Sequence, residues 1–152
     1  NICKFYKEGS LIMKKIQHIL VPIDGSEHSI NAIEQAISLA ENQSIKLSFL
    51  YVTNIQKISV DSYLLDEILK SHHHMGENIL KNAKEKVPSG IDAKTYLEEG
   101  TPSTTIVNFA KKNNVDLIIM GTRGLGSVQS ALLGSVSHDV IHHATCSVML
   151  CK

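Results

Sequence analysis

The sequence predicts an α/β protein built on a parallel sheet with helices on both faces, and three observations carry that prediction. Short β-rich segments alternate with amphipathic helical segments along almost the whole chain. The apolar run over residues 117–120 is bounded by glycine and too short for an independent helix, so it indicates a strand buried on both faces. Polar or glycine-rich turns follow the strands, where such sheets bind their ligands.

Composition predicts one soluble domain and excludes several classes of function. The chain has 152 residues, of which 43% are hydrophobic and 20% charged. Its 15 basic and 15 acidic residues cancel, so no nucleic-acid or anionic-membrane surface is expected. No apolar stretch approaches the roughly 20 residues that cross a bilayer. Three cysteines without metal-ligand spacing favour a reducing cytoplasm.

Residues 1–12 are interpreted as an N-terminal extension to a domain that spans residues 13–152. The chain begins at Asn1, whereas Met13-Lys14-Lys15 resembles a natural start just before the first strand. The favoured interpretation is a vector-derived or read-through segment, and the alternative is a natural flexible extension.

The first part of the domain predicts two strands with one helix between them. A β-rich run over residues 16–24 ends in Asp-Gly-Ser, where Ser26 is a favourable N-cap and Glu27 suits the first turn. Apolar residues then recur every three or four positions to about Asn42, which predicts an amphipathic helix. Residues 46–53 follow as the second strand.

The middle of the chain predicts a loop, a long helix and a polar strand. The signal is weak over residues 54–60, which we interpret as a loop. Helical spacing runs from Leu65 to Ala83 and stops at Pro88-Ser89-Gly90. Gly76 lies inside this pattern, and glycine there lowers the stability of the helix by about 1 kcal/mol relative to alanine. Residues 93–99 are more polar, so they are expected at an edge of the sheet.

The last part predicts two helices and two strands. Pro102 stands where a first helical residue tolerates proline, and that helix runs to Asn113-Asn114. The buried strand over residues 116–120 leads into glycine-rich chain, and Gly134-Ser135 opens a helix that reaches His143. Residues 147–152 close the sheet as its fifth strand, and such an apolar exposed edge invites pairing with a second copy.

Three loops are expected to converge on one crevice at the carboxyl ends of the strands. They are Asp24-Gly25-Ser26, Val52-Thr53 and the segment 121–137. Glycines at 121, 124 and 134 leave backbone amides uncovered next to a helix N-terminus, which is an arrangement that binds phosphate. Asp24 would repel phosphate, so it is expected at the nucleoside end of the ligand.

Other signatures of chemistry are absent or weak. The glycine spacing matches neither the dinucleotide fingerprint nor the P-loop. His72-His73-His74 are consecutive and would point in different directions on a helix. His138 and His142 lie four apart, but without an H-E-x-x-H motif a solvated helix face is the favoured interpretation. Cys146 and Cys151 are expected as buried apolar residues, and no G-x-S-x-G motif supports a serine nucleophile. No catalytic residue and no metal ligand is therefore predicted.

The spacing Gly121-x2-Gly124-x9-Gly134-Ser135, together with Val21-Pro22-Ile23-Asp24, resembles the universal stress protein family. The resemblance covers nearly the whole chain from Met13 to Lys152. It implies a five-stranded parallel sheet in the order 3-2-1-4-5, and usually a homodimer. Family members with this motif are similar in binding ATP, so it implies ATP as the ligand. AMP or ADP would be alternatives, and Mg2+ would arrive with the phosphates.

The resemblance also implies which residues contact the ligand. They are Pro22, Asp24, Val52, Met120, Gly121, Arg123, Gly124, Gly134, Ser135, Val136 and Ser137. Pro22 and Asp24 would meet the adenosine end, and Val52 would line the adenine pocket. Met120 and the first two motif glycines would hold ribose and phosphates, while residues 134–137 would receive the phosphate chain. Arg123 stands at a position that varies in the family, and we expect it to contact phosphate.

The expected function is a cytoplasmic, nucleotide-dependent stress-response or signalling module without strong catalysis. One alternative is an enzyme that cleaves ATP between the α and β phosphates, as related adenine-nucleotide folds do. Those enzymes resemble one another in an S-G-G-x-D-S loop after the first strand, whereas this chain has Asp24-Gly25-Ser26-Glu27. The other alternative is a dimeric scaffold that binds no nucleotide.

Overall fold

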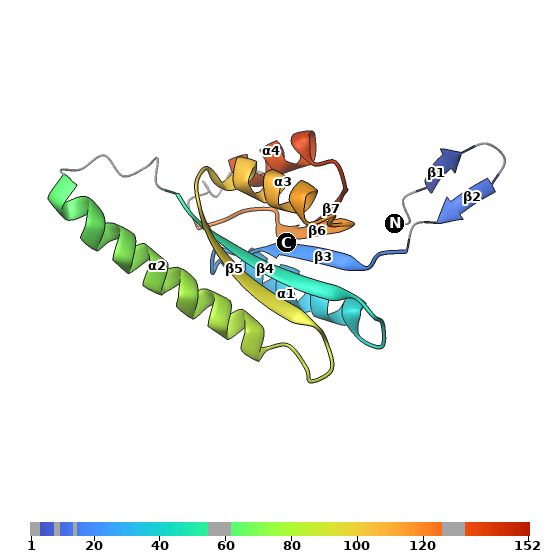
Figure 1. Ribbon diagram of the computed structural model, residues 1–152, viewed down its shortest axis with the longest axis horizontal. Helices are drawn as coiled ribbons and strands as arrows, with labels where there is room; N and C mark the ends of the chain where they lie inside the picture. Colours follow the sequence, from blue (N-terminus) through green and yellow to red (C-terminus); the bar gives the residue numbers. More distant parts are fainter. Residues whose placement is uncertain (1–3, 8–9, 14, 55–61, 126–132) are drawn as a thin grey trace.

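The computed structural model describes residues 4–7, 10–13, 15–54, 62–125 and 133–152. Over these ranges a pair of N-terminal strands precedes a strict alternation of strands and helices (Figure 1). The elements are β1 (Lys4–Lys7), β2 (Ser10–Met13), β3 (His18–Pro22), α1 (Glu27–Ala40), β4 (Lys46–Thr53), α2 (Ser62–Glu85), β5 (Ala93–Glu99), α3 (Pro102–Lys112), β6 (Leu117–Gly121), α4 (Ser135–His143) and β7 (Ser147–Cys151). The predicted loop over 54–60 and residues 126–132 of the glycine-rich segment lie largely outside the described residues.

The main sheet is parallel and runs in the order β5-β4-β3-β6-β7. Numbered along the domain, this is 3-2-1-4-5, which confirms the predicted fold class. The chain builds outward from β3 to β4 and β5, then returns to place β6 on the other side of β3. The strand order therefore reverses between β3 and β6, and ligands of open α/β sheets bind beyond the strand ends at such a point.

Helices cover both faces of the sheet (Figure 1), and an apolar layer lies between the helices and the strands on each face. Ile19 and Val21 of β3 face the layer under α1 and α2, whereas Leu20 between them faces the layer under α3 and α4. This alternation follows from the two-residue period of a strand. Residues 117–120 are at most 5% exposed, so the strand predicted to be buried on both faces is confirmed.

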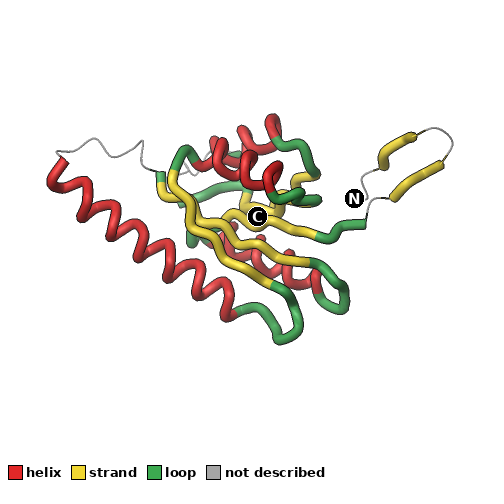
Figure 2. The backbone as a smooth tube through the Cα atoms, in the orientation of Figure 1, coloured by secondary structure: helices red, strands yellow, loops and turns green. Residues whose placement is uncertain are grey.

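The N-terminal extension contains a hairpin that the sequence analysis does not predict. Strands β1 and β2 pair antiparallel, with Lys4 opposite Met13 and Lys7 opposite Ser10. They form a separate two-stranded sheet, which stands apart from the domain in Figure 2. A lone two-stranded hairpin is marginal in water, so this one contributes little to the stability of the domain.

A buried histidine ties the amino-terminal ends of the strands together. The His18 ring is 8% exposed, with Nδ1 3.1 Å from the carbonyl oxygen of Asn113 and Nε2 2.8 Å from Ser48 Oγ. A carbonyl can only accept, so Nδ1 carries the proton and the Ser48 hydroxyl donates to Nε2. Burial lowers the pKa of His18, which favours the neutral ring that this arrangement requires.

Gly76 is unfavourable for helix formation, but it is needed for the packing of α2 on the sheet. A Cβ at this position would lie 2.6 Å from Cδ1 of Tyr51 and 3.1 Å from Cδ1 of Leu97. Tyr51 is 7% exposed, so its ring has little space into which it could move. Glycine therefore lets α2 lie directly on β4 and β5.

Among the described residues, no helix is both long and apolar enough to cross a membrane.

We predict that Gly76→Ala destabilises the domain although it improves helix propensity. Propensity alone would add about 1 kcal/mol, but overlap with the Tyr51 ring should cost about 1–3 kcal/mol. Urea unfolding should show a lower midpoint for this variant. Asn82→Ala on the exposed side of the same helix should not lower the midpoint, and a Gly76→Ala midpoint above wild type would refute the packing role.

Candidate functional site

The predicted ligand residues gather at the carboxyl ends of three adjacent strands. Pro22 ends β3, Val52 lies near the end of β4, and Met120 lies near the end of β6. Val52 and Met120 both pack in the layer under α3 and α4, together with Val136 of α4. The structure therefore brings three of the predicted ligand residues, Val52, Met120 and Val136, to one face of the sheet, near the point where the strand order reverses.

Asp24 joins the loop after β3 to the loop after β6. Its Oδ1 accepts a hydrogen bond from the amide of Ser26 at 3.0 Å, and its Oδ2 accepts one from the amide of Leu125 at 3.0 Å. Gly25 follows at φ +86°, a conformation that L side chains rarely adopt. One carboxylate thus fixes the turn into α1 and the start of the glycine-rich segment.

Gly124 has no side chain because the Asp24 carboxylate occupies that space. A Cβ at this position would overlap Oδ2 of Asp24. The sequence predicts that glycine at this position lets a phosphate approach the backbone. In the structure, the group that approaches Gly124 is the carboxylate of Asp24. A phosphate beside Gly124 would meet the negative charge of Asp24, so this end of the segment suits the uncharged part of a nucleotide.

The first turn of α1 packs against the end of β6. A Cβ on Gly121 would lie 2.8 Å from Cβ of His28 and 2.9 Å from its carbonyl carbon. Beside this contact, His28 Nδ1 lies 2.8 Å from the hydroxyl of Thr122. Gly121 is therefore required for helix-to-strand packing, and His28 with Thr122 fixes the segment from the α1 side.

The start of α4 is held on the same segment by Thr122. The amide of Gly134 donates to the Thr122 carbonyl at 2.8 Å, and the single proton of the Ser137 hydroxyl is shared between that carbonyl at 2.8 Å and the carbonyl of Gly134 at 2.9 Å. Ser137 is 3% exposed. Its predicted ligand contact stays a prediction, but its hydroxyl already has protein acceptors, so such a contact would use the amide.

The N-terminus of α4 is the part of the site best suited to an anion. Gly134 is its N-cap and, in the described part of the chain, gives no side-chain hydrogen bond to the first turn. The first amides of a helix have no acceptor within the helix, and the helix dipole adds partial positive charge there. Ser135 is exposed and Val136 half-buried, so residues at this helix start are accessible. These features fit a phosphate group.

Among the other polar residues of these strands and loops, Tyr51 and Thr53 are buried and Arg123 is half-buried. Burial and the negative charge of Asp24 raise the pKa of the Tyr51 phenol, which therefore stays neutral. Thr53, at the end of β4, is 1% exposed, and its Oγ1 has no hydrogen-bond partner among the described residues. Arg123 is half-buried, and its carbonyl lies 3.4 Å from the Ser26 hydroxyl that donates to it. Its predicted phosphate contact stays a prediction.

Sequence reasoning missed the contacts that hold this segment. His28 and Thr122 were not singled out, because a histidine in a first helical turn and a threonine between motif glycines carry no specific signal. Only their proximity in the fold identifies them.

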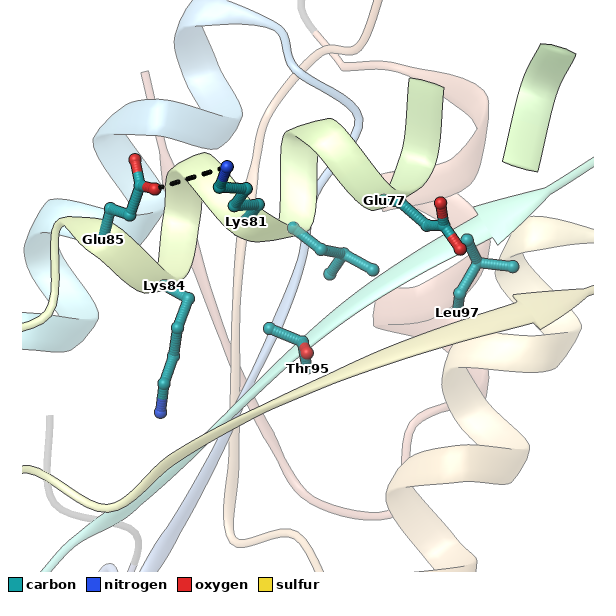
Figure 3. Close-up of a pocket in the computed structure, with 7 residues that line it drawn as sticks. Glu77, Lys81, Lys84, Glu85, Thr95 and Leu97 are labelled. Carbon is teal, nitrogen blue, oxygen red and sulfur yellow. Dashed lines mark ion pairs between the residues drawn. The ribbon is translucent and has the colours of Figure 1, made fainter. Parts of the chain in front are cut away.

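A separate groove lies along the outer edge of the sheet and contains none of the predicted ligand residues. It has a volume of about 370 Å³ between the second half of α2 and β5, and it is shown in Figure 3. Its lining from α2 carries charges of both signs, with Lys81 Nζ 4.0 Å from Oε1 of Glu85, and β5 contributes Thr95 and Leu97. It belongs to the packing of α2 on β5, not to the carboxyl edge of the sheet.

Comparison with known proteins gives one consistent result. The sequence model described as the universal stress protein family matches residues 15–152. The chain is 37% identical over 144 residues to the universal stress protein YxiE of Bacillus subtilis, covering 88% of this chain and 97% of that protein. It is 34% identical over 152 residues to a universal stress protein of Methanocaldococcus jannaschii, covering 96% and 86%.

Solved structures agree with the sequence comparison. The universal stress protein UspA from Lactobacillus plantarum superposes with a TM-score of 0.85 at 27% identity, covering 91% of this chain and 99% of that one. Two more distant structures share the fold and carry nucleotides. One is a universal stress protein in complex with cAMP, with a TM-score of 0.61 at 24% identity. The other is an Arabidopsis thaliana family protein with AMP bound, with a TM-score of 0.68 at 21% identity.

We predict that Asp24 and Gly124 are energetically coupled. Asp24→Ala should cost about 1–3 kcal/mol, because two backbone amides lose their acceptor. Gly124→Ala should also destabilise the wild type, but it should cost much less in the Asp24→Ala background, where the added methyl group meets no carboxylate. A double-mutant cycle by urea unfolding measures this coupling. Additive free energies for the two changes would contradict the contact.

Proposed function

This chain belongs to the universal stress protein family, and on that premise we propose that it binds an adenine nucleotide, with ATP as the preferred ligand. The nucleotide occupies the carboxyl edge of the sheet between the loop after β3 and the start of α4. Relatives that share the fold carry cAMP and AMP, which supports an adenine nucleotide as the ligand class.

The observation that carries this proposal is the opposite chemistry of the two ends of the site. Asp24 places a carboxylate at Gly124, where it can accept hydrogen bonds from ribose hydroxyls. The start of α4 offers first-turn amides with no side-chain cap from Gly134. A nucleotide therefore binds with its sugar at Asp24 and its phosphates at residues 134–137. Each added phosphate gains from the helix start, which favours ATP over AMP.

The proposed role is binding rather than turnover. Asp24, the carboxylate placed in the proposed site, already accepts hydrogen bonds from two backbone amides, so it is poorly placed to activate water. We infer at most slow hydrolysis and a module that responds to stress through its nucleotide state. Mg2+ would come with the phosphates, because that ion usually keeps several waters and binds through substrate phosphates. The proposed location is the cytoplasm.

A homodimer through β7 is the second part of the proposal. β7 is an edge strand, and Ser147–Leu150 are only half-buried although three of these four residues are apolar. An edge strand of this kind can extend its sheet with a second copy. Pairing would cover the apolar residues and leave both nucleotide sites at the carboxyl edges.

We predict that Ser135→Asp separates nucleotide binding from folding. ATP at 100 times its Kd should stabilise the wild type by about 2.7 kcal/mol, which is seen as a rise in melting temperature. A carboxylate in the first turn should stabilise α4 by about 0.3–1 kcal/mol, yet it should repel phosphate. The variant should therefore keep its melting temperature without ligand and lose most of the rise with ATP. Neutral Ser135→Asn is the matched control and should keep most of the rise, and an undiminished rise in the aspartate variant would refute phosphate binding there.

We also predict that a charge on β7 dissociates the dimer. Val148→Lys should shift the chain from dimer to monomer in sedimentation velocity, because the paired edge would then bury an ammonium group. Thr95→Lys, on the opposite edge strand, is the control and should stay dimeric, with circular dichroism showing that both variants are folded. A wild type that sediments as a monomer at tens of micromolar would overturn this part of the proposal.

A further inference from the structure

The exposed side of α4 carries a pair of histidines with unusual proximity. His138 and His142 lie four residues apart in a regular helix, and their ring centroids are 4.5 Å apart with planes inclined by 57°. Both side chains are exposed, while Val140 and Ser137 of the same helix face the interior. Neither histidine belongs to the nucleotide site proposed above, which uses the first turn of α4.

The distance between these rings matches that of two ligands of one metal ion. A metal–nitrogen bond of about 2.0–2.1 Å puts each imidazole centroid about 3.2 Å from the metal, so two ligands at about 90° have centroids about 4.5 Å apart. Two histidines one helical turn apart are also the pair that zinc proteases use on a helix. The sequence favoured a solvated face, and the ring separation is the new observation.

A neighbouring carboxylate favours one orientation of the first ring. Asp139 Oδ1 lies 3.6 Å from Nδ1 of His138, and its other oxygen accepts a hydrogen bond from Ser103 at 3.3 Å. Metal-binding histidines usually direct the second ring nitrogen towards such a carboxylate, which leaves Nε2 for the metal. The negative charge of Asp139 also offsets part of the charge of a bound cation.

We propose that His138 and His142 chelate one late first-row transition-metal ion. Imidazole nitrogen is a common ligand of Ni2+, Cu2+ and Zn2+, so the proposal covers this group of ions. The described residues contain no group of three or more His, Cys, Asp or Glu suited to a metal, so water completes the coordination. The site is therefore open to exchange and suits sensing better than permanent structural binding.

Calorimetric titration of the metal-free full chain with NiCl2, without nucleotide, tests this proposal. The expected result is one Ni2+ per chain, with affinity falling about tenfold or more in His138→Ala and in His142→Ala. His143→Ala is the matched control on the same helix, because His143 Nδ1 already lies 2.8 Å from the carbonyl oxygen of Asp139. It should bind like the wild type.

Long-range ¹H–¹⁵N spectra of the imidazoles provide a readout independent of fold stability. Zn2+, which is diamagnetic, should shift the ring nitrogens of His138 and His142 and leave those of His143 in place. Absence of binding, equal loss in the His143→Ala control, or metal-induced shifts at other histidines alone would overturn the proposal. Since no nucleotide is present, none of these outcomes depends on the nucleotide site.

Discussion

The carboxylate of Asp24 is the constraint around which the proposed site is built. It accepts the amide of Leu125, which lies 101 positions further along the chain, and it also accepts the amide of Ser26 in its own loop. This contact joins the two loops that flank the reversal of strand order. A buried or half-buried carboxylate needs such partners, and backbone amides supply them without a second charged side chain. The loops are thereby aligned before any ligand arrives.

The glycines of the site follow from this alignment and from the packing of helices on strand ends. Gly124 leaves space for Asp24, and Gly121 leaves space for the first turn of α1 at His28. Gly134 differs, since the nearest atoms to its absent side chain lie 3.4–3.6 Å away, which is ordinary contact distance. Gly121 and Gly124 are thus required for packing within the protein, whereas Gly134 begins α4 without a side-chain cap. In the proposed binding mode, only residues 134–137 are then left to receive the phosphates.

Much of the fold was predictable because strand and helix periods are local. The strands at 46–53 and 93–99 were placed at the observed limits, and the order of the sheet followed from the family resemblance. The role of Gly76 was not predictable, because its neighbour Tyr51 lies 25 positions away and only the tertiary fold brings them together. The same holds for the contact of His28 with Thr122 and for the contact of the Ser137 hydroxyl with the Thr122 carbonyl, which join distant parts of the sequence. The hairpin of β1 and β2 was not predicted, because two strands of four residues each are too short to show a clear hydrophobic alternation.

The most direct test of the account is to locate the nucleotide by amide chemical shifts in the ¹⁵N-labelled chain as ATP and adenosine are added separately. We predict that both ligands shift the amides of Val52 and of residues around Asp24, and that only ATP also shifts the amides of Ser135 and Val136, with one ATP bound per chain. Shifts confined to the groove between α2 and β5, or identical patterns for ATP and adenosine, would contradict it.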